Sequence, residues 1–110
     1  MQENQIIKQG KNTAIISYMT IVGAIIAIMM NRETKNTFAC FHIRQAFGIH
    51  LLFHAFAILS NLWGGAYGFY GLYLCYIIIW MYGFIGALSS KKQEIPYLGP
   101  FFQKWFTFIE

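Results

Sequence analysis

Two histidines, His50 and His54, lie four residues apart in a stretch, residues 46–90, that contains no Asp, Glu, Lys or Arg. On a helix this spacing places both imidazoles on one face, where an H-x-x-x-H pair can bind a metal ion. The residues between them are Leu-Leu-Phe, so the glutamate of the H-E-x-x-H protease motif is absent. No Cys, Asp or Glu elsewhere is placed to complete a ligand set. The sequence therefore predicts no metal centre and no cofactor.

Asn61 shares this helical face with His50 and His54, and together the three form a polar intramembrane face. Ionisable groups inside a membrane point to function, so three uses remain open. Neutral histidine rings could hydrogen-bond Ser17, Thr20 or a tyrosine of a neighbouring helix. Haem or a metal could bind His50 and His54, with a second haem ligand from another copy of the chain. A proton-coupled role is the third.

Other catalytic patterns are missing from the chain. The four serines form no G-x-S-x-G motif, and the sequence contains no aspartate. The uncharged stretches therefore contain no paired carboxylates for acid–base chemistry. The sequence predicts a protein that is not an enzyme.

Composition indicates the environment of these residues. Of 110 residues, 57% are hydrophobic and only 11% are charged, whereas a soluble domain carries about 25% charged residues. This excludes a soluble or disordered chain and predicts one all-α integral membrane domain over residues 1–110. Eight basic residues outnumber four acidic ones and lie in short flanks. They fit the anionic headgroups of a bilayer and form no continuous stripe for nucleic acid.

Three stretches are long and apolar enough to cross a hydrocarbon core about 30 Å thick. We expect transmembrane helices at about 13–30, 38–62 and 66–88. The second turn falls near Gly64, where Asn, Trp and two glycines cluster. After Pro100, five apolar residues fall on one helical face, which predicts a C-terminal amphipathic helix in the membrane interface; they are Phe101, Phe102, Trp105, Phe108 and Ile109.

The basic residues predict an orientation for a three-span chain. The first stretch is too long for a signal-peptide core and lacks a small-x-small cleavage site, so we expect it to be retained. Lys8 and Lys11 would then lie on one side of the membrane, and the other six on the opposite side: Arg32, Lys35, Arg44, Lys91, Lys92 and Lys104. The positive-inside rule predicts a multi-pass protein of the cell inner (plasma) membrane, with its N-terminus outside and its C-terminus in the cytoplasm.

Small residues recur along the third predicted helix and suggest how helices associate. Gly64, Gly68, Gly71 and Gly86 would let helix backbones approach closely, and the first two form a GxxxG motif. This face is either the inside of a three-helix bundle or an interface between copies. We therefore expect a homo-oligomer or a membrane-protein partner.

The start of the second predicted helix, Phe41-His42-Ile43-Arg44-Gln45-Ala46-Phe47-Gly48, contains an F-H-x-R-Q-A motif. The motif follows one span and a short charged loop. In this arrangement the chain resembles the small bacterial relatives of the twenty-kilodalton component of the chloroplast inner-envelope import translocon. Residues 11–18, 80–87 and 96–106 are also similar to that family. The plastid proteins have four spans, and this chain has room for three and a tail.

The resemblance implies an α-helical membrane domain associated with protein import, acting through helix contacts or assisting polypeptide or solute passage. Only His42, Arg44 and Gln45 match the motif, so His50 and His54 inherit no role. We expect Arg44 to pair with a lipid phosphate or an acidic partner, and the other two to bond a neighbouring helix. The alternative functions are haem or metal binding, and an accessory subunit that stabilises a larger membrane complex.

Overall fold

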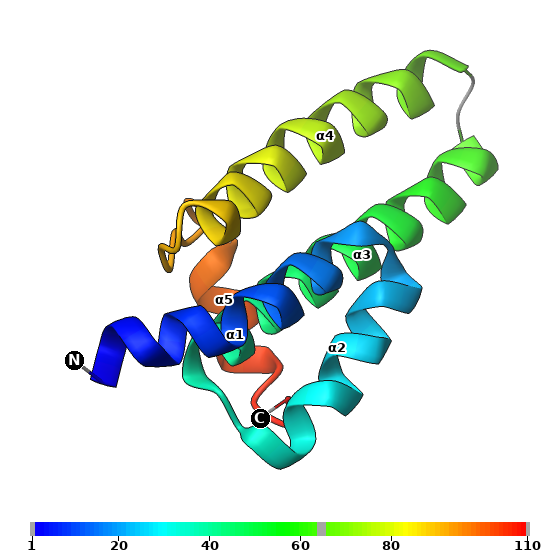
Figure 1. The fold of residues 1–110 in the computed structure, drawn as a ribbon. Coiled ribbons are helices and arrows are strands. Elements are labelled where there is room, and N and C mark those ends of the chain that lie inside the picture. The colour runs from blue at the N-terminus through cyan, green and yellow to red at the C-terminus, as the bar shows by residue number, and fades with distance from the viewer. Residues whose placement is uncertain (1, 64–65, 110) are drawn as a thin grey trace.

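The computed structural model describes residues 2–63 and 66–109, and within these ranges the chain is helical, without a strand (Figure 1). The helices are α1 (Gln2–Met19), α2 (Ile21–Thr34), α3 (Thr37–Trp63), α4 (Ala66–Leu88) and α5 (Gly99–Trp105). The all-α prediction is confirmed. In the described part of the chain, two helices are long and apolar enough to cross a membrane, at Thr37–Leu62 and Gly68–Leu88. They coincide with the second and third expected spans.

The expected helix over 13–30 is wrong, because the chain bends at Thr20. This residue has extended backbone angles (φ −154°, ψ 176°), and its hydroxyl accepts the Gly23 amide at 3.1 Å as the N-cap of α2. Gly23 permits the bend, since a Cβ there would collide with the Ile16 carbonyl. The apolar run is therefore divided between the end of α1 and the whole of α2.

Helices α1 and α2 form a hairpin that packs on α3. At 1.5 Å per residue, the 14-residue α2 is about 21 Å long, short of a hydrocarbon core of about 30 Å. Its small residues Ala24 and Ala27 are buried, whereas Val22, Ile26 and Met29 are exposed. The hairpin therefore covers part of the length of α3 and turns back.

Asparagines hold the connection between α2 and α3. The Asn36 side-chain oxygen accepts the Ala39 amide at 2.9 Å and caps α3, while its nitrogen donates to the Ile6 carbonyl of α1 at 2.7 Å. Asn31, which is buried, accepts the Asn36 amide at 3.0 Å. A side chain at Gly10 would collide with Asn36. This turn therefore joins the first half of α1 to the start of α3.

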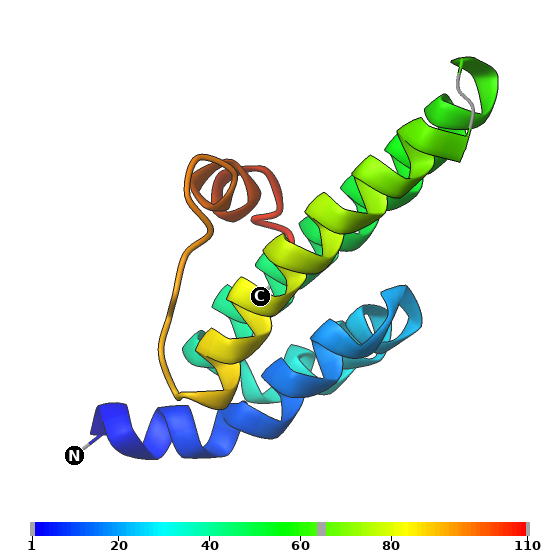
Figure 2. The ribbon, with the colours of Figure 1, turned by 90° about the horizontal axis from the view of Figure 1, so that it is seen from above.

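Helices α3 and α4 form a long antiparallel arm that extends beyond the rest of the molecule (Figure 1). Among residues 37–62 and 68–88, the buried residues of α3 end at His50, and those of α4 lie in its last turns, at Gly83, Gly86 and Ala87. We call the part of the arm from Leu51 to Trp63 and from Ala66 to Cys75 the outer half. The remainder, covered by α1, α2 and α5, is the inner half. Figure 2 shows the α1–α2 hairpin and α5 on opposite sides of the arm.

The C-terminal segment packs on α3 and differs from the expected amphipathic surface helix. Its aromatic residues divide between the core and the surface: Phe102 is buried against Gly48, and Phe101 and Trp105 are exposed. Ile109, beyond the end of α5, is also fully buried. Pro100 occupies the first turn of α5, as expected. The segment therefore anchors in the protein and still presents an aromatic surface outward.

Both ends of the described chain lie at the inner end of the arm. Ile6 is bonded to the turn before α3, and the carbonyl of Ile109 accepts from Arg44 at 3.0 Å. Because α1 and α2 form a hairpin, Lys8 and Lys11 lie at the same end as the other six basic residues. Ile7 borders one hollow with Lys91 and Lys92, and Gly10 packs against Asn36, the residue after Lys35. The arrangement that placed them opposite depended on a continuous helix over 13–30, which the chain does not form.

We predict that Gly23→Leu destabilises the protein, because its Cβ meets backbone at the bend whereas the Cβ of Gly68→Leu meets open space. Overpacking costs about 1–3 kcal/mol, which corresponds to a fall in Tm of roughly 5 °C or more for a domain of this size. Thermal unfolding in a mild detergent, followed by circular dichroism, measures the difference. Equal Tm values for the two leucine variants would contradict the bend.

Candidate functional site

The F-H-x-R-Q-A motif lies in the inner half of α3, where α1, α4 and α5 converge. Its polar side chains bind segments that are distant in sequence. His42 and Gln45 are fully buried and lie one turn apart on the helix. Arg44 is half-buried on another face. All three are therefore bonded within the protein.

His42 connects α1 to the segment that follows α4. Its Nε2 lies 2.8 Å from the Lys91 carbonyl, and its Nδ1 lies 2.7 Å from the Tyr18 hydroxyl. A carbonyl oxygen only accepts, so Nε2 carries the proton and Nδ1 accepts from Tyr18. In the neutral imidazole, this arrangement selects the tautomer that is protonated on Nε2.

Gln45 completes the network. Its amide nitrogen donates to the Tyr18 hydroxyl at 3.0 Å and to the Gln93 carbonyl at 3.1 Å, and its oxygen accepts the Ile95 amide at 2.9 Å. The Tyr18 hydroxyl thus accepts one proton and donates one, and both hydrogens of the amide are used. Within the described residues, every buried side-chain polar atom has a partner. The hydrogen bonds of this network therefore lie within the protein and join α1, α3 and the segment that follows α4.

Gly83 lets α4 approach this network. A Cβ at that position would lie 2.9 Å from the Tyr18 hydroxyl and 3.1 Å from the Gln45 amide nitrogen. Trp80, one turn earlier on α4, donates its indole N–H to the Tyr18 carbonyl. These contacts fix α4 against α1 at the level of the motif.

His50 repeats the pattern of His42 two turns further along α3. Its Nε2 lies 3.1 Å from the Ser17 carbonyl of α1, and its Nδ1 lies 3.2 Å from the Tyr76 hydroxyl of α4. The carbonyl again requires the proton on Nε2, and Nδ1 accepts from the tyrosine. This geometry agrees with the first of the three uses considered from the sequence, in which a neutral ring hydrogen-bonds neighbouring helices. A metal or haem iron could bind only after one of these bonds broke.

Arg44 holds the C-terminal segment. Its Nε donates to the Ile109 carbonyl at 3.0 Å, and its Nη2 reaches the Thr107 carbonyl at 3.4 Å. Cys40, one turn earlier, donates its thiol to the same Ile109 carbonyl at 3.3 Å. Arg44 therefore binds backbone carbonyl groups of the residues that follow α5. Part of its half-buried side chain remains exposed.

The predicted polar face divides between the two halves of the arm. His50 is 1% exposed, whereas His54 and Asn61 are exposed in the outer half, beyond the end of α1. The Nδ1 of His54 donates to the His50 carbonyl at 2.7 Å, which leaves its Nε2 a lone-pair acceptor with no partner among the described residues. Asn61 likewise has no side-chain bond within the described part of the chain.

The predicted packing glycines also divide. A Cβ at Gly68 or Gly71 would meet no atom within 4 Å, so neither contacts another helix of this chain. Gly86 instead packs against Gln93 of the segment after α4, where a Cβ would lie 2.7 Å from the Gln93 Cβ. Gly64 lies outside the described residues. In the part of the chain that the structure describes, these glycines therefore do not line the inside of a closed three-helix bundle.

Within the described ranges, no group of three or more His, Cys, Asp or Glu side chains is gathered as a metal site. The fold and this network define a helical protein with two candidate membrane-spanning helices and a buried hydrogen-bonded core. No protein-family model, curated protein or solved structure matches the chain.

Several residues of the network were not singled out from the sequence. Tyr18, Trp80 and Gly83 lie in apolar stretches, where their types alone indicate only apolar helices. Asn36 could have been found, because an asparagine three residues before Ala39 opens an apolar run and is a helix N-cap signal.

We predict that Gln45→Leu releases the segment between α4 and α5. The substitution leaves the Ile95 amide and the Gln93 carbonyl without their partner, at about 1–3 kcal/mol for each buried group. Trypsin should then cleave after Lys91 and Lys92 several times faster than in the unaltered protein.

Gln103→Leu is the matched control, because Gln103 makes one bond, to the Phe41 carbonyl at 2.8 Å. A helical carbonyl such as this already accepts from the chain four residues on. Limited proteolysis and thermal unfolding compare the two variants in one detergent. Equal cleavage rates would contradict the role assigned to Gln45.

Proposed function

We propose that this chain is a small non-enzymatic membrane protein that acts by packing its outer half against another membrane-embedded helix. The resemblance to bacterial relatives of the import translocon component agrees with this role. Two spans do not enclose a pore, so assistance to a polypeptide or solute would be a property of the assembled complex. An accessory subunit that only stabilises such a complex is the other form of the proposal.

The observation that carries the proposal is the open Nε2 of His54. The side chain is exposed within the span Thr37–Leu62, about 12 Å along the helix from Leu62 at 1.5 Å per residue. A polar group facing hydrocarbon without a partner costs free energy. A donor from another helix removes that cost, and polar side chains of this kind connect membrane helices.

The surroundings of His54 favour a helical partner. The outer half exposes large apolar side chains, including Ile58, Leu62 and Leu74. A Cβ at Gly68 would meet no atom within 4 Å, so a second backbone could approach α4 closely there. The α1–α2 hairpin ends below this level and leaves the position beside His54 uncovered.

We predict that His54→Leu weakens the complex recovered by affinity purification from native membranes in mild detergent. Loss of one interhelical hydrogen bond, about 0.6–1.7 kcal/mol, corresponds to roughly three- to fifteenfold weaker association. His54→Gln restores a polar side chain of similar reach and should recover most of the association. Identical recovery of partners with leucine and glutamine would count against the proposal.

Haem binding is the second candidate, and the geometry confines it to His54. Both nitrogens of His50 are bonded, whereas Nε2 of His54 keeps an open lone pair. Two copies would supply two such nitrogens. A Soret band in the purified protein that disappears in His54→Leu supports this candidate, and a featureless spectrum after incubation with haemin removes it.

For the orientation, we propose that both termini face the cytoplasm and that the far end of the arm faces outward in the plasma membrane. All eight basic residues then lie on the cytoplasmic side, as the positive-inside rule favours. This revises the expectation of an external N-terminus, which depended on three crossings.

Cysteine labelling tests the orientation in a background with Cys40 and Cys75 replaced by serine. A membrane-impermeant maleimide added to intact cells should label Leu62→Cys and leave Gln2→Cys and Phe108→Cys unlabelled. All three should react after the membrane is permeabilised. Labelling of Gln2→Cys in intact cells would restore the external N-terminus.

A further inference from the structure

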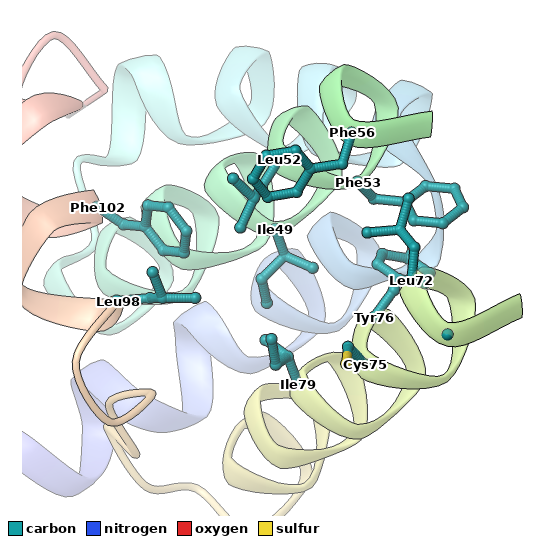
Figure 3. Close-up of a pocket in the computed structure, with 11 residues that line it drawn as sticks. Ile49, Leu52, Phe53, Phe56, Leu72, Cys75, Tyr76, Ile79, Leu98 and Phe102 are labelled. Atoms are coloured by element: carbon teal, nitrogen blue, oxygen red, sulfur yellow. The ribbon is translucent and has the colours of Figure 1, made fainter. Parts of the chain in front are cut away.

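An apolar cavity opens between α3, α4 and α5 (Figure 3). Its volume is about 410 Å³, within the range of roughly 300–1,000 Å³ found for ligand pockets. Phe53 and Phe56 line it from α3, Cys75 and Ile79 from α4, and Phe102 from α5. The lining residues of α3 and α4 lie within the two candidate spans, away from their ends, so the cavity is at the depth of the hydrocarbon core.

A second hollow, of about 400 Å³, lies at the inner end of the same helices and is basic. Lys35, Arg44 and Lys92 line it, together with Thr37 and Gln103. Among the described residues that line it, none is a carboxylate. Basic residues at the cytoplasmic end of membrane helices attract anionic lipid headgroups.

The two hollows adjoin the same part of α5, because Phe102 lines the apolar cavity and the next residue, Gln103, lines the basic one. Along α3, the distance from Arg44 to Phe56 is about 18 Å at 1.5 Å per residue. One leaflet of a hydrocarbon core about 30 Å thick is about 15 Å deep. The length from the basic hollow to the far wall of the cavity therefore matches one acyl chain.

We propose that the paired hollows bind one anionic phospholipid, with its phosphate at Lys35, Arg44 and Lys92 and one acyl chain in the apolar cavity. A partner helix does not fit the cavity, since a cylinder about 10 Å wide and 18 Å long occupies roughly 1,400 Å³. An unbranched chain fits between the side chains of α3 and α4. The proposal depends on the membrane placement proposed above and not on a protein partner.

Native mass spectrometry of the full chain tests the headgroup. The protein in mild detergent is mixed with equal amounts of phosphatidylglycerol and phosphatidylcholine that carry identical acyl chains. We expect phosphatidylglycerol adducts to exceed phosphatidylcholine adducts by about fivefold or more, and Lys35→Gln with Lys92→Gln to abolish the preference. The matched control is Lys8→Gln with Lys11→Gln, which removes two cations that do not line the hollow and should leave the preference intact. Equal binding of both lipids, or equal effects of the two pairs, overturns the proposal.

Two glycines of α4 test the cavity. Gly71 lines it and Gly68 does not, and a Cβ at either position meets no atom within 4 Å. Gly71→Leu should place its side chain in the cavity and reduce phosphatidylglycerol adducts several-fold, whereas Gly68→Leu should retain them. Matching Tm values show that both variants fold. Retention of the lipid in Gly71→Leu overturns the acyl-chain site. These lipid measurements use no partner, so they stand or fail separately from the test of His54.

Discussion

Polar groups buried among apolar helices must be paired within the protein, and this constraint organises the inner half of the chain. Tyr18 connects His42 and Gln45, and the two residues of α3 in turn hold the segment that follows α4. Each donor in this set has an acceptor, and each imidazole is confined to one tautomer. Hydrophobic contact alone would leave the angles between these helices loosely determined, since lipid tails compete equally well for apolar surface. The hydrogen bonds therefore select one arrangement of α1, α3 and α4.

The arm of α3 and α4 divides into an inner and an outer half at the level where the other helices stop covering it. In the inner half, small and polar residues of α3 and α4 face inward, and the polar side chains are hydrogen-bonded. In the outer half, the same two helices expose bulky apolar side chains and the Nε2 of His54, which has no partner among the described residues. The inner half thus has the properties of a folded core and the outer half those of an interface. The basic residues collect at the end that the hairpin covers, beside the hollow formed with Lys92 and Gln103.

Much of the architecture follows from residue patterns, and what does not depends on contacts between distant segments. The bounds of α3 and α4 agree with the apolar stretches at 38–62 and 66–88, because hydropathy and length report directly on such helices. The bend at Thr20 was missed because an N-cap within an apolar run does not change hydropathy, although Thr20 and Gly23 carry a signal. The face shared by His50 and His54 was predicted as one unit. The structure divides this face, because the α1–α2 hairpin reaches the level of His50 and not that of His54. The spacing of residues on α3 carries no information about the length of that hairpin.

The hydrogen-bond partners of the motif have a consequence for biosynthesis. His42, Gln45 and Arg44 bond to atoms between residues 91 and 109, which are translated after α3 and α4. During translation, α3 leaves the ribosome with these side chains unpaired. At that stage α1 and α2 cannot yet pack against α4. These side chains must then remain hydrated, or be shielded by the insertion machinery, until residues 91–109 have left the ribosome. The hydrogen-bonded core of the inner half can therefore close only after residues 91–109 have been synthesised.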